Sequence, residues 1–299
     1  MEHKVRISFI IASVDRDQQL QQCIASIERA HEYRSDIAVE ILVVIQKSKS
    51  PKVISMPHPD IVSIYYIDEL GLSVSRNYAI AKSTGDYLVF IDDDAAVGED
   101  FIDILSNTVL KYDNVKVFCG KLFDPVQNRP FSHLFYNNEG KILGRYDYKY
   151  FMGSAHVLSR DVVIGIGGYD ERFGVGSLYY GSEESDIFFR LKASNEKVLY
   201  VPELVFHHPI INAAPRYVYN YAYAVGAMLT KNCINDKAFF FIYCWIVIEI
   251  AIKASIRILQ KVLLGGIYND KDERYHYSSL IKGTFKGIYD FLSKELKVH

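Results

Sequence analysis

The sequence predicts an α/β protein whose core is a mostly parallel sheet with flanking helices. Two observations support this fold class. Continuous apolar runs of strand length alternate with segments of helical periodicity over about the first 120 residues. These runs lack the in–out alternation of a sheet with one solvated face, which indicates strands buried on both sides. Strands that alternate with helices pair in parallel through right-handed crossovers.

The first half of the chain supplies most of this sheet. A strand is predicted over Val5–Ala12, followed by the polar turn Ser13–Asp17 and by a helix with apolar residues at helical spacing. Those apolar residues are Leu20, Cys23, Ile24 and Ile27. The next elements are strands over Val39–Ile45, Ile61–Ile67 and Tyr87–Ile91, and a helix over Gly71–Lys82 that ends near a C-cap at Gly85.

The middle of the chain, from about residue 121 to 215, is less regular. It contains an apolar segment, Phe151–Ser159, and a glycine-rich stretch, Gly165–Asp170. A helix is predicted over Glu183–Ala193 and a short strand over Val198–Val201.

Three consecutive aspartates, Asp92, Asp93 and Asp94, follow the apolar strand that ends at Ile91. Ligands of open α/β sheets bind at the carboxyl ends of the strands. Carboxylates crowded there repel one another, and a divalent cation removes that cost. Because alternate residues of an extended segment point the same way, Asp92 and Asp94 can address one Mg²⁺ or Mn²⁺ ion. The competing interpretation is an acidic surface turn.

Several stretches in the chain resemble the family-2 glycosyltransferases, which have the GT-A fold. The resemblance covers about residues 5–230 and rests on the order of the stretches more than on any one of them. They are Ile7–Ile27, Gly71–Asn77 (GLSVSRN), Ser83–Asp94 (STGDYLVFIDDD), Gly167–Phe173 (GGYDERF), and Ser182–Ile187 with Arg190 (SEESDI).

The resemblance implies an inverting, metal-dependent sugar transfer from a nucleotide-sugar donor. Asp92 and Asp93 would bind the donor at its diphosphate, and Asp92 and Asp94 would hold the metal, with Asp94 the more direct ligand. Arg76 would lie along the nucleotide or its phosphates, where a planar guanidinium suits paired contacts. Without the motif, Arg76 would be read as a helix-surface residue.

The resemblance also implies the acceptor side of the site. Glu184 would be the general base that takes the acceptor's proton, and Glu183 would bind acceptor hydroxyls, although which of the two is the base stays open. Acids in a first helical turn are otherwise explained by the helix dipole. His207, with His208 as the second choice, would be a further metal ligand.

The second predicted strand departs from the family pattern. Family members usually place an aspartate here that holds the base, whereas this chain reads Val44-Ile45-Gln46. The Gln46 amide can hydrogen-bond a base edge, and Ser13 and Asp15 in the first turn are further candidates for donor contacts. The base of the donor is therefore not fixed by the sequence.

Composition narrows the alternatives. The 299-residue chain has a net charge of −2 and 49% hydrophobic residues, which is typical of a globular protein and gives no reason to expect nucleic-acid binding. Its four cysteines are scattered without a CxxC pair, which indicates reduced, buried thiols in a cytoplasmic chain.

The C-terminal region differs from the rest. Phe239–Ile248 is ten apolar residues long, and from Lys231 onward 11 Lys and Arg outnumber 7 Asp and Glu. A spanning helix needs about 20 apolar residues, so residues 238–264 are predicted to form an amphipathic helix at the cytoplasmic face of a membrane. A core helix or a dimer helix is the open alternative.

Three regions follow from these observations: a donor-binding half over residues 1–120, an acceptor-binding half over 121–230, and a C-terminal helical region over 231–299. The predicted reaction moves a hexosyl or N-acetylhexosaminyl group, expected to be UDP-linked, to a glycan or lipid-linked acceptor in surface polysaccharide assembly. A nucleotidyltransferase, a Mg²⁺-dependent phosphatase and a catalytically degenerate membrane scaffold are the alternatives. The oligomeric state is open.

Overall fold

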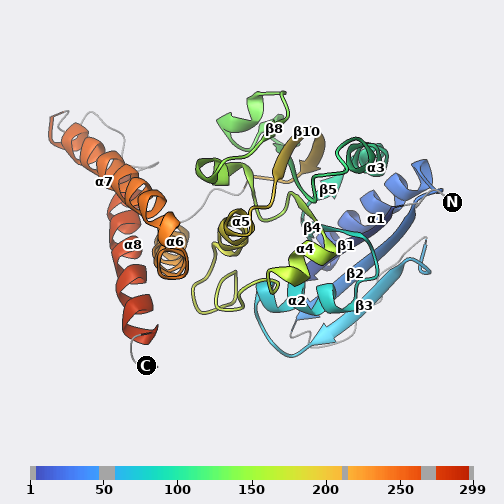
Figure 1. Cartoon of the computed structure of the whole chain (residues 1–299), viewed down its shortest axis with the longest axis horizontal. Coiled ribbons are helices and arrows are strands. Elements are labelled where there is room, and N and C mark those ends of the chain that lie inside the picture. The colour runs from blue at the N-terminus through green and yellow to red at the C-terminus, as the bar shows by residue number, and fades with distance from the viewer. Residues whose placement is uncertain (1–4, 47–57, 211–214, 264–273, 296–299) are drawn as a thin grey trace. The chain divides into compact units, whose positions relative to one another are not determined.

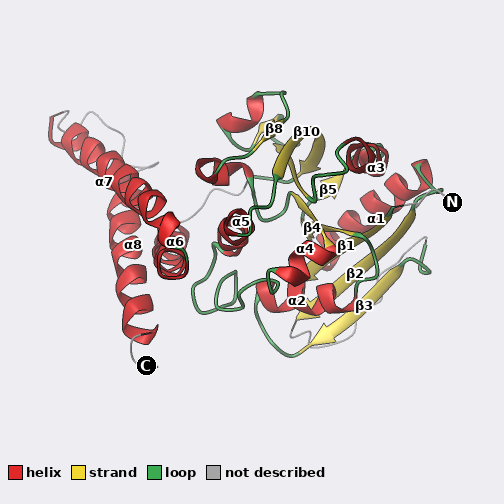
Figure 2. Cartoon of the chain, in the orientation of Figure 1, coloured by secondary structure: helices red, strands yellow, loops and turns green. Residues whose placement is uncertain are grey.

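A computed structural model describes residues 5–46, 58–210, 215–263 and 274–295. The chain divides into two compact units. The first comprises Met1–Glu171 and Ile187–Ile210, and the second comprises Arg172–Asp186 and Ile211–His299. Figure 2 shows that strands occur in the first unit, whereas the described elements after residue 215 are helices.

The first unit is built on a ten-stranded sheet in the order β3-β2-β1-β4-β9-β6-β10-β5, with β7 on β6 and β8 on β10. The α/β fold class is confirmed. The strands are β1 (Arg6–Ser13), β2 (Ala38–Gln46), β3 (Val62–Ile67), β4 (Tyr87–Asp92), β5 (Ala96–Val97), β6 (Val117–Asp124), β7 (Arg129–Pro130), β8 (Lys141–Ile142), β9 (His156–Ser159) and β10 (Val198–His207).

Strands β3, β2, β1 and β4 form a parallel block, and all four match predicted strands. Beyond β4 the sheet is mixed, because β9 pairs antiparallel with both β4 and β6. Strand β10 then pairs parallel with β6. Strand β1, inside the parallel block, is buried on both faces: Ile7, Phe9, Ile10 and Ile11 are each at most 1% exposed.

Helices cover both faces of this sheet. Figure 1 shows α1 (Asp17–Tyr33) and α3 (Phe101–Lys111) on one side, and α2 (Leu72–Lys82) and α4 (Arg160–Gly165) on the other. The four predicted apolar positions of α1 are all buried. Its neighbour α3 contributes Phe101, whose ring lies 6.0 Å from that of Phe9.

Gly85 has a different role from the predicted one. Helix α2 ends at Lys82 and its C-cap is Ser83. A Cβ on Gly85 would instead lie 2.4 Å from the Oγ atom of Ser8 and 2.7 Å from its backbone nitrogen. The glycine is therefore required by the close approach of the segment before β4 to β1.

The second unit is a helical assembly of α6 (Pro215–Asn235), α7 (Phe240–Leu263) and α8 (Arg274–Glu295), together with the first turn of α5 (Glu183–Ala193). Helices α6 and α8 meet backbone to backbone along Gly226, Gly283 and Gly287. A Cβ at Gly226 would lie 2.1 Å from the carbonyl oxygen of Thr284, and one at Gly287 would lie 2.0 Å from that of Tyr223. This contact has no room for larger side chains.

Helix α7 exposes an apolar stripe to solvent. Phe241 is 73% exposed and Trp245 is 57% exposed. Ile248, Ile252 and Leu259 continue the stripe and are each more than half exposed. Among the described residues, no helix combines the length and the apolar character needed to cross a bilayer.

Candidate functional site

The acidic triplet lies at the carboxyl end of β4. Asp92 is the last residue of that strand and pairs in register with Ala12 of β1. A turn follows, in which the Ala95 backbone N–H donates to the Asp92 carbonyl over 3.1 Å. Because Leu88–Ile91 are buried, the strand is fixed in the core and delivers the three carboxylates to the edge of the sheet.

Asp92, Asp94 and His208 form a cluster that could hold a metal ion. One potential ligand atom from each residue lies within 4.8 Å of the others. The Nε2 atom of His208 is 3.2 Å from Asp94 Oδ1 and 3.7 Å from Asp92 Oδ2. Two carboxylates and one imidazole form a donor set that suits Mn²⁺ or Mg²⁺.

His208 is held by the backbone around it. Its N–H donates to the carbonyl of Phe123 over 2.9 Å, and its Nδ1 atom lies 2.9 Å from the Pro209 carbonyl. A carbonyl oxygen only accepts, so Nδ1 carries the proton and Nε2 faces the carboxylates. A neutral ring in this tautomer presents the Nε2 lone pair, which is the atom a metal requires.

The carboxylates and the histidine shift each other's pKa. Burial disfavours the charged imidazole, but the hydrogen bond to Asp94 and the charges of Asp92 and Asp94 outweigh it and raise the pKa of His208. The hydrogen bond from His208 likewise lowers the pKa of Asp94. A cation would replace the proton in this arrangement, because it offers the same carboxylates a positive charge.

Asp93 points to a different set of partners. It is 5% exposed, and its Oδ2 atom accepts a hydrogen bond from the Ser13 hydroxyl over 2.6 Å. Burial is the main cause that raises the pKa of Asp93. The Nη1 atom of Arg16 bridges Asp93 and Asp94, at 3.1 Å and 2.7 Å. Ser13 therefore supports the acidic triplet in this structure.

Arg16 was not among the predicted site residues. The available signal was its place in the polar turn Ser13–Asp17 after the first strand. Asp15, in the same turn, has a φ of 52°, a left-handed conformation that an aspartate adopts more readily than most residues. Asp15 thus shapes the turn that presents Arg16.

Arg76 is buried behind the cluster instead of lying on a helix surface. It is 2% exposed, and its Nη2 atom donates to Asp92 Oδ1 over 3.2 Å and to the Gly153 carbonyl over 2.7 Å. Its guanidinium also lies over the ring of Tyr169, 5.3 Å from the centroid. A buried guanidinium held at this point supplies a fixed positive charge beside the metal cluster.

Two of the family-like stretches contact each other through Asn77, the residue after Arg76. Its side chain donates to the carbonyl of Tyr169 over 2.9 Å and accepts from the Tyr169 N–H over 2.8 Å. A Cβ on Gly168 would lie 2.7 Å from the Asn77 side-chain oxygen, and the φ of Gly168 is +69°. Glycine is required there because the backbone must approach the amide.

His156 lies next to Tyr169 and is enclosed by aromatic rings. Its ring lies between Phe90 and Phe151, at centroid distances of 4.9 and 4.6 Å. Its Nδ1 atom donates to the Met152 carbonyl over 2.9 Å, which leaves Nε2 to accept from the Tyr169 hydroxyl. Burial, assisted by the nearby charge of Arg76, lowers the pKa of His156 to about 3.

The low pKa of His156 predicts a loss of stability in mild acid. The unfolded chain takes up the proton below its ordinary pKa of about 6.5, whereas the folded chain resists it. The contribution of neutral His156 to the unfolding free energy is complete above the unfolded pKa and is lost as pH falls toward 3. Between pH 7 and pH 5 the group should remove about 2 kcal/mol from the unfolding free energy. Urea unfolding at both pH values measures it.

The variant His156→Gln serves as the comparison for that measurement. It lacks the titrating ring, so its unfolding free energy should fall less between pH 7 and pH 5 than that of the wild type. All other titrating groups are shared by the two proteins. An equal decline in both would show that His156 does not carry the effect.

The remaining predicted donor residue, Gln46, uses its side-chain oxygen within the protein. It is 4% exposed, and its Oε1 atom accepts from the Gly71 N–H over 2.7 Å. Gly71 has a φ of 142° and precedes α2. Gln46 therefore fixes the start of the helix that carries Arg76, which is a second use for the residue besides the predicted contact with a base.

The structure separates the two adjacent histidines. His208 belongs to the acidic cluster, whereas His207, the preferred choice from the sequence, pairs with Ala96 of β5 and lies 6.0 Å from the ring of Phe123. Burial lowers the pKa of His207. His207 is the last residue of β10 and His208 follows the strand, and of the two only His208 lies at the aspartates.

The glutamate pair opens α5, in the part of the helix that belongs to the second unit. Glu183 is 6% exposed and Glu184 is partly exposed. Asp186, one turn further, is fully buried and accepts from Lys231 over 2.7 Å and from Asn232 over 3.0 Å. Asp186 therefore anchors the first turn of α5 to α6 within the second unit.

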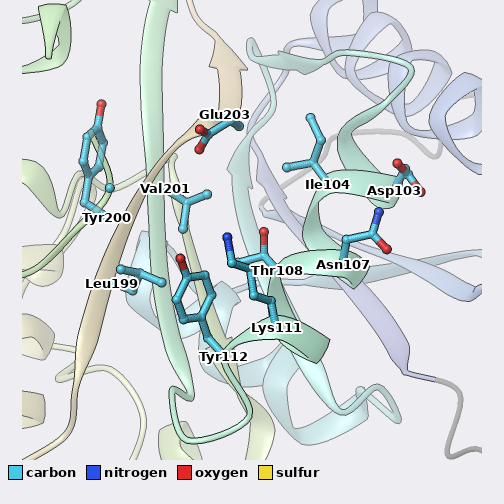
Figure 3. A pocket seen from close by; sticks show the side chains of 11 residues that line it. Asp103, Ile104, Asn107, Thr108, Lys111, Tyr112, Leu199, Tyr200, Val201 and Glu203 are labelled. Carbon is cyan, nitrogen blue, oxygen red and sulfur yellow. The ribbon is translucent and has the colours of Figure 1, made fainter. Parts of the chain in front are cut away.

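A separate hollow of about 400 Å³ lies between α3 and β10 (Figure 3). The side chain of Lys111 from α3 extends toward Val201 of β10. None of the predicted site residues lines it. This hollow is therefore distinct from the acidic cluster.

Comparison with known proteins identifies the family. The sequence profile of Glycosyl transferase family 2 matches residues 8–167, more than half of the chain. The chain therefore belongs to this family of glycosyltransferases. A search of curated proteins found no match.

Solved structures share the GT-A fold with this chain. A mannosyltransferase, PcManGT from Pyrobaculum calidifontis, in complex with GDP-Man and Mn²⁺, is 16% identical with a TM-score of 0.65, over 97% of this chain and 88% of that one. S. aureus TarS 1-349 in complex with UDP is 11% identical with a TM-score of 0.58, over 75% of this chain and 65% of that one. At these identities the similarity establishes the fold.

Proposed function

We propose that this glycosyltransferase moves a sugar from a nucleoside diphosphate sugar to a hydroxyl group, with inversion at the anomeric carbon. The observation that supports it best is the Asp92, Asp94 and His208 cluster at the carboxyl ends of β4 and β10, with the buried Arg76 beside it. Ligands of such sheets bind at this edge. A cation and a diphosphate both fit a site that combines carboxylates with a fixed guanidinium group.

In this proposal the residues of the cluster prepare the leaving group. Asp92, Asp94 and His208 would hold Mn²⁺ or Mg²⁺, which when bound neutralises charge on the departing nucleoside diphosphate. Arg76 supplies a second positive charge that needs no reorganisation, because it is already fixed by the Gly153 carbonyl. Asp93 supports the carboxylates through Ser13 and Arg16.

Glu184 is the proposed general base. It is the more exposed of the two acids that open α5, which suits a group that must reach an acceptor hydroxyl. Glu183, at 6% exposed, would bind acceptor hydroxyls. Removal of the acceptor proton as the bond forms makes direct displacement feasible, and attack opposite the leaving group inverts the anomeric centre.

The donor and acceptor belong to the same proposal. UDP is proposed as the nucleotide, the transferred group as a hexosyl or N-acetylhexosaminyl unit, and the acceptor as a glycan or a lipid-linked glycan in surface polysaccharide assembly. The similar structures are of proteins in complex with GDP-Man in one case and with UDP or UDP-GlcNAc in another. Both nucleotides must therefore be tested.

A donor screen tests the function. The full chain is incubated with Mn²⁺ or Mg²⁺ and a panel of UDP- and GDP-sugars, and the released nucleotide is identified. Release of nucleoside diphosphate supports sugar transfer. Pyrophosphate would indicate nucleotidyl transfer, free phosphate would indicate a phosphatase, and absence of donor binding across the panel would favour a catalytically degenerate scaffold.

The apolar stripe of α7 supports a peripheral membrane contact through residues 238–264 as a further part of the proposal. Phe241 and Ile252 are more than half exposed, and Lys253 and Arg257 follow in the sequence, so the segment combines apolar anchors with positive charge. A helix of this kind lies in the plane of the cytoplasmic leaflet. A dimer interface would use the same apolar residues.

Vesicle binding is expected to depend on these residues. Cosedimentation with vesicles containing anionic lipid should fall about tenfold or more when both Phe241 and Ile252 are replaced by aspartate, because each burial of a large apolar side chain contributes about 1.5–3 kcal/mol. Val126→Asp, which alters an 81% exposed position in the first unit, is the control. If the double variant binds vesicles like the wild type, or if neither binds and the wild type is a dimer, the membrane proposal is wrong.

A further inference from the structure

Arg16 binds the acidic triplet next to the Asp92, Asp94 and His208 cluster, and it shares Asp94 with that cluster. A single nitrogen, Nη1, contacts both Asp93 Oδ1 and Asp94 Oδ2, at 3.1 and 2.7 Å. Within the described part of the chain, no hydrogen bond is recorded for its Nη2 or Nε atoms. The guanidinium therefore contacts both carboxylates through one nitrogen, and its other N–H groups remain able to donate to a second partner.

Arg16 differs from Arg76 in how firmly it is held. The side chain of Arg16 is 48% exposed, whereas that of Arg76 is 2% exposed and bonded to a backbone carbonyl. An ion pair with a half-exposed arginine is weak and exchangeable. Arg76 is fixed in place, and Arg16 can exchange its partners without any change in the core.

The backbone presents Arg16 at this point. The turn before it contains Asp15 at a φ of 52°, and Arg16 itself is the N-cap residue of α1, with a φ of −117° and a ψ of 51°. Ser13, two residues before Asp15, is hydrogen-bonded to Asp93. The turn is thus bonded to the acidic triplet through Ser13 at its start and through Arg16 at its end. These two contacts keep the arginine within reach of any ligand of the triplet.

We propose that Arg16 is a diphosphate-binding residue that also substitutes for the cation when the site is empty. In the empty site its guanidinium holds Asp93 and Asp94. Once a divalent cation takes the Asp94 carboxylate, the guanidinium turns to the donor's diphosphate, for which its planar fork of donors is well matched. This inference rests on the proposed function and adds a residue, and an order of events, to that site.

The proposal predicts effects of opposite sign for the same substitution. In Arg16→Ala, Mn²⁺ alone should bind about three- to tenfold more tightly, because a positive charge that competes for Asp94 is gone. At saturating Mn²⁺, the affinity for UDP or GDP should fall about tenfold or more, because a charge-assisted contact to phosphate is lost. A residue with a merely structural role would weaken both.

The experiment measures Mn²⁺ binding by the paramagnetic resonance of free Mn²⁺, and nucleotide binding by calorimetry with UDP and with GDP, using the full chain. Arg16→Lys should retain wild-type Mn²⁺ affinity and lose part of the nucleotide affinity, since it keeps the charge without the fork. Arg29→Ala removes the same charge from an exposed position of α1 and should stay within twofold of the wild type in both assays. Thermal melting confirms that each variant is folded.

Several results would overturn the inference. If Arg16→Ala binds Mn²⁺ more weakly than the wild type, Arg16 does not compete with the cation. If its nucleotide affinity at saturating Mn²⁺ stays within twofold of the wild type, Arg16 does not bind the diphosphate. A wild-type protein that binds neither Mn²⁺ nor nucleotide would overturn the proposed function together with this inference, whereas failure of the variants alone leaves the proposed function standing.

Discussion

Replacing Asp94 by asparagine is expected to lower kcat/KM for sugar transfer about 10³-fold. Asp94 contacts both His208 and Arg16, at 3.2 and 2.7 Å, and belongs to the group that could hold the metal. The amide keeps the shape of the side chain and removes the negative charge. The loss is then one of cation binding and leaving-group stabilisation.

The measurement combines initial transfer rates over a range of Mn²⁺ concentrations with direct Mn²⁺ binding. Excess Mn²⁺ should recover only part of the activity of Asp94→Asn, because one anionic ligand is missing at any concentration. Glu99→Gln, which neutralises an exposed carboxylate five residues further along the chain, should behave as the wild type. A loss of less than about tenfold in Asp94→Asn would exclude Asp94 as a metal ligand.

Replacing Glu184 by glutamine is the second substitution with a large expected effect. Loss of a general base lowers kcat by about 10²–10⁴-fold, while interactions with the donor remain. The affinity for UDP or GDP at saturating Mn²⁺ should therefore stay near that of the wild type.

Paired variants decide between the two adjacent acids. Glu183→Gln should raise KM for the acceptor more than it lowers kcat, whereas Glu184→Gln should act on kcat. Glu196→Gln, just beyond the C-terminal end of the same helix, is the control for a change of charge on α5. Equal kcat in Glu184→Gln and the wild type would remove Glu184 from the mechanism, and the reverse pattern in the pair would transfer the role to Glu183.

Local pattern predicted the parallel part of the sheet because each of its strands is a continuous apolar run. Val39–Ile45 and Tyr87–Ile91 correspond closely to β2 and β4. The insertion of β9 between β4 and β6 could not be predicted, since strand order depends on contacts between distant segments. The strand predicted over Val198–Val201 is longer in the structure and ends at His207. The prediction stopped short because a register shift between Tyr200 and Val205 interrupts the pattern of the strand.

The candidate site was predicted in part for similar reasons. The aspartates follow a recognisable strand, so their place at the sheet edge is readable from the sequence. The choice between His207 and His208 depends on where β10 ends and on its register against β6, and an irregularity within β10 shifts that register. The role of Arg16 was also hard to predict from the sequence. Its contact with Asp93 and Asp94 spans more than 70 residues and depends on the left-handed conformation of Asp15.

The glycine contact between α6 and α8 bears on how the protein is made. These helices approach so closely at Gly226 and Gly287 that each fills the space a side chain would take on the other. While α8 is still inside the ribosome, that face of α6 has no covering. Translation adds about 5–20 residues per second, so α6 must wait several seconds for its partner.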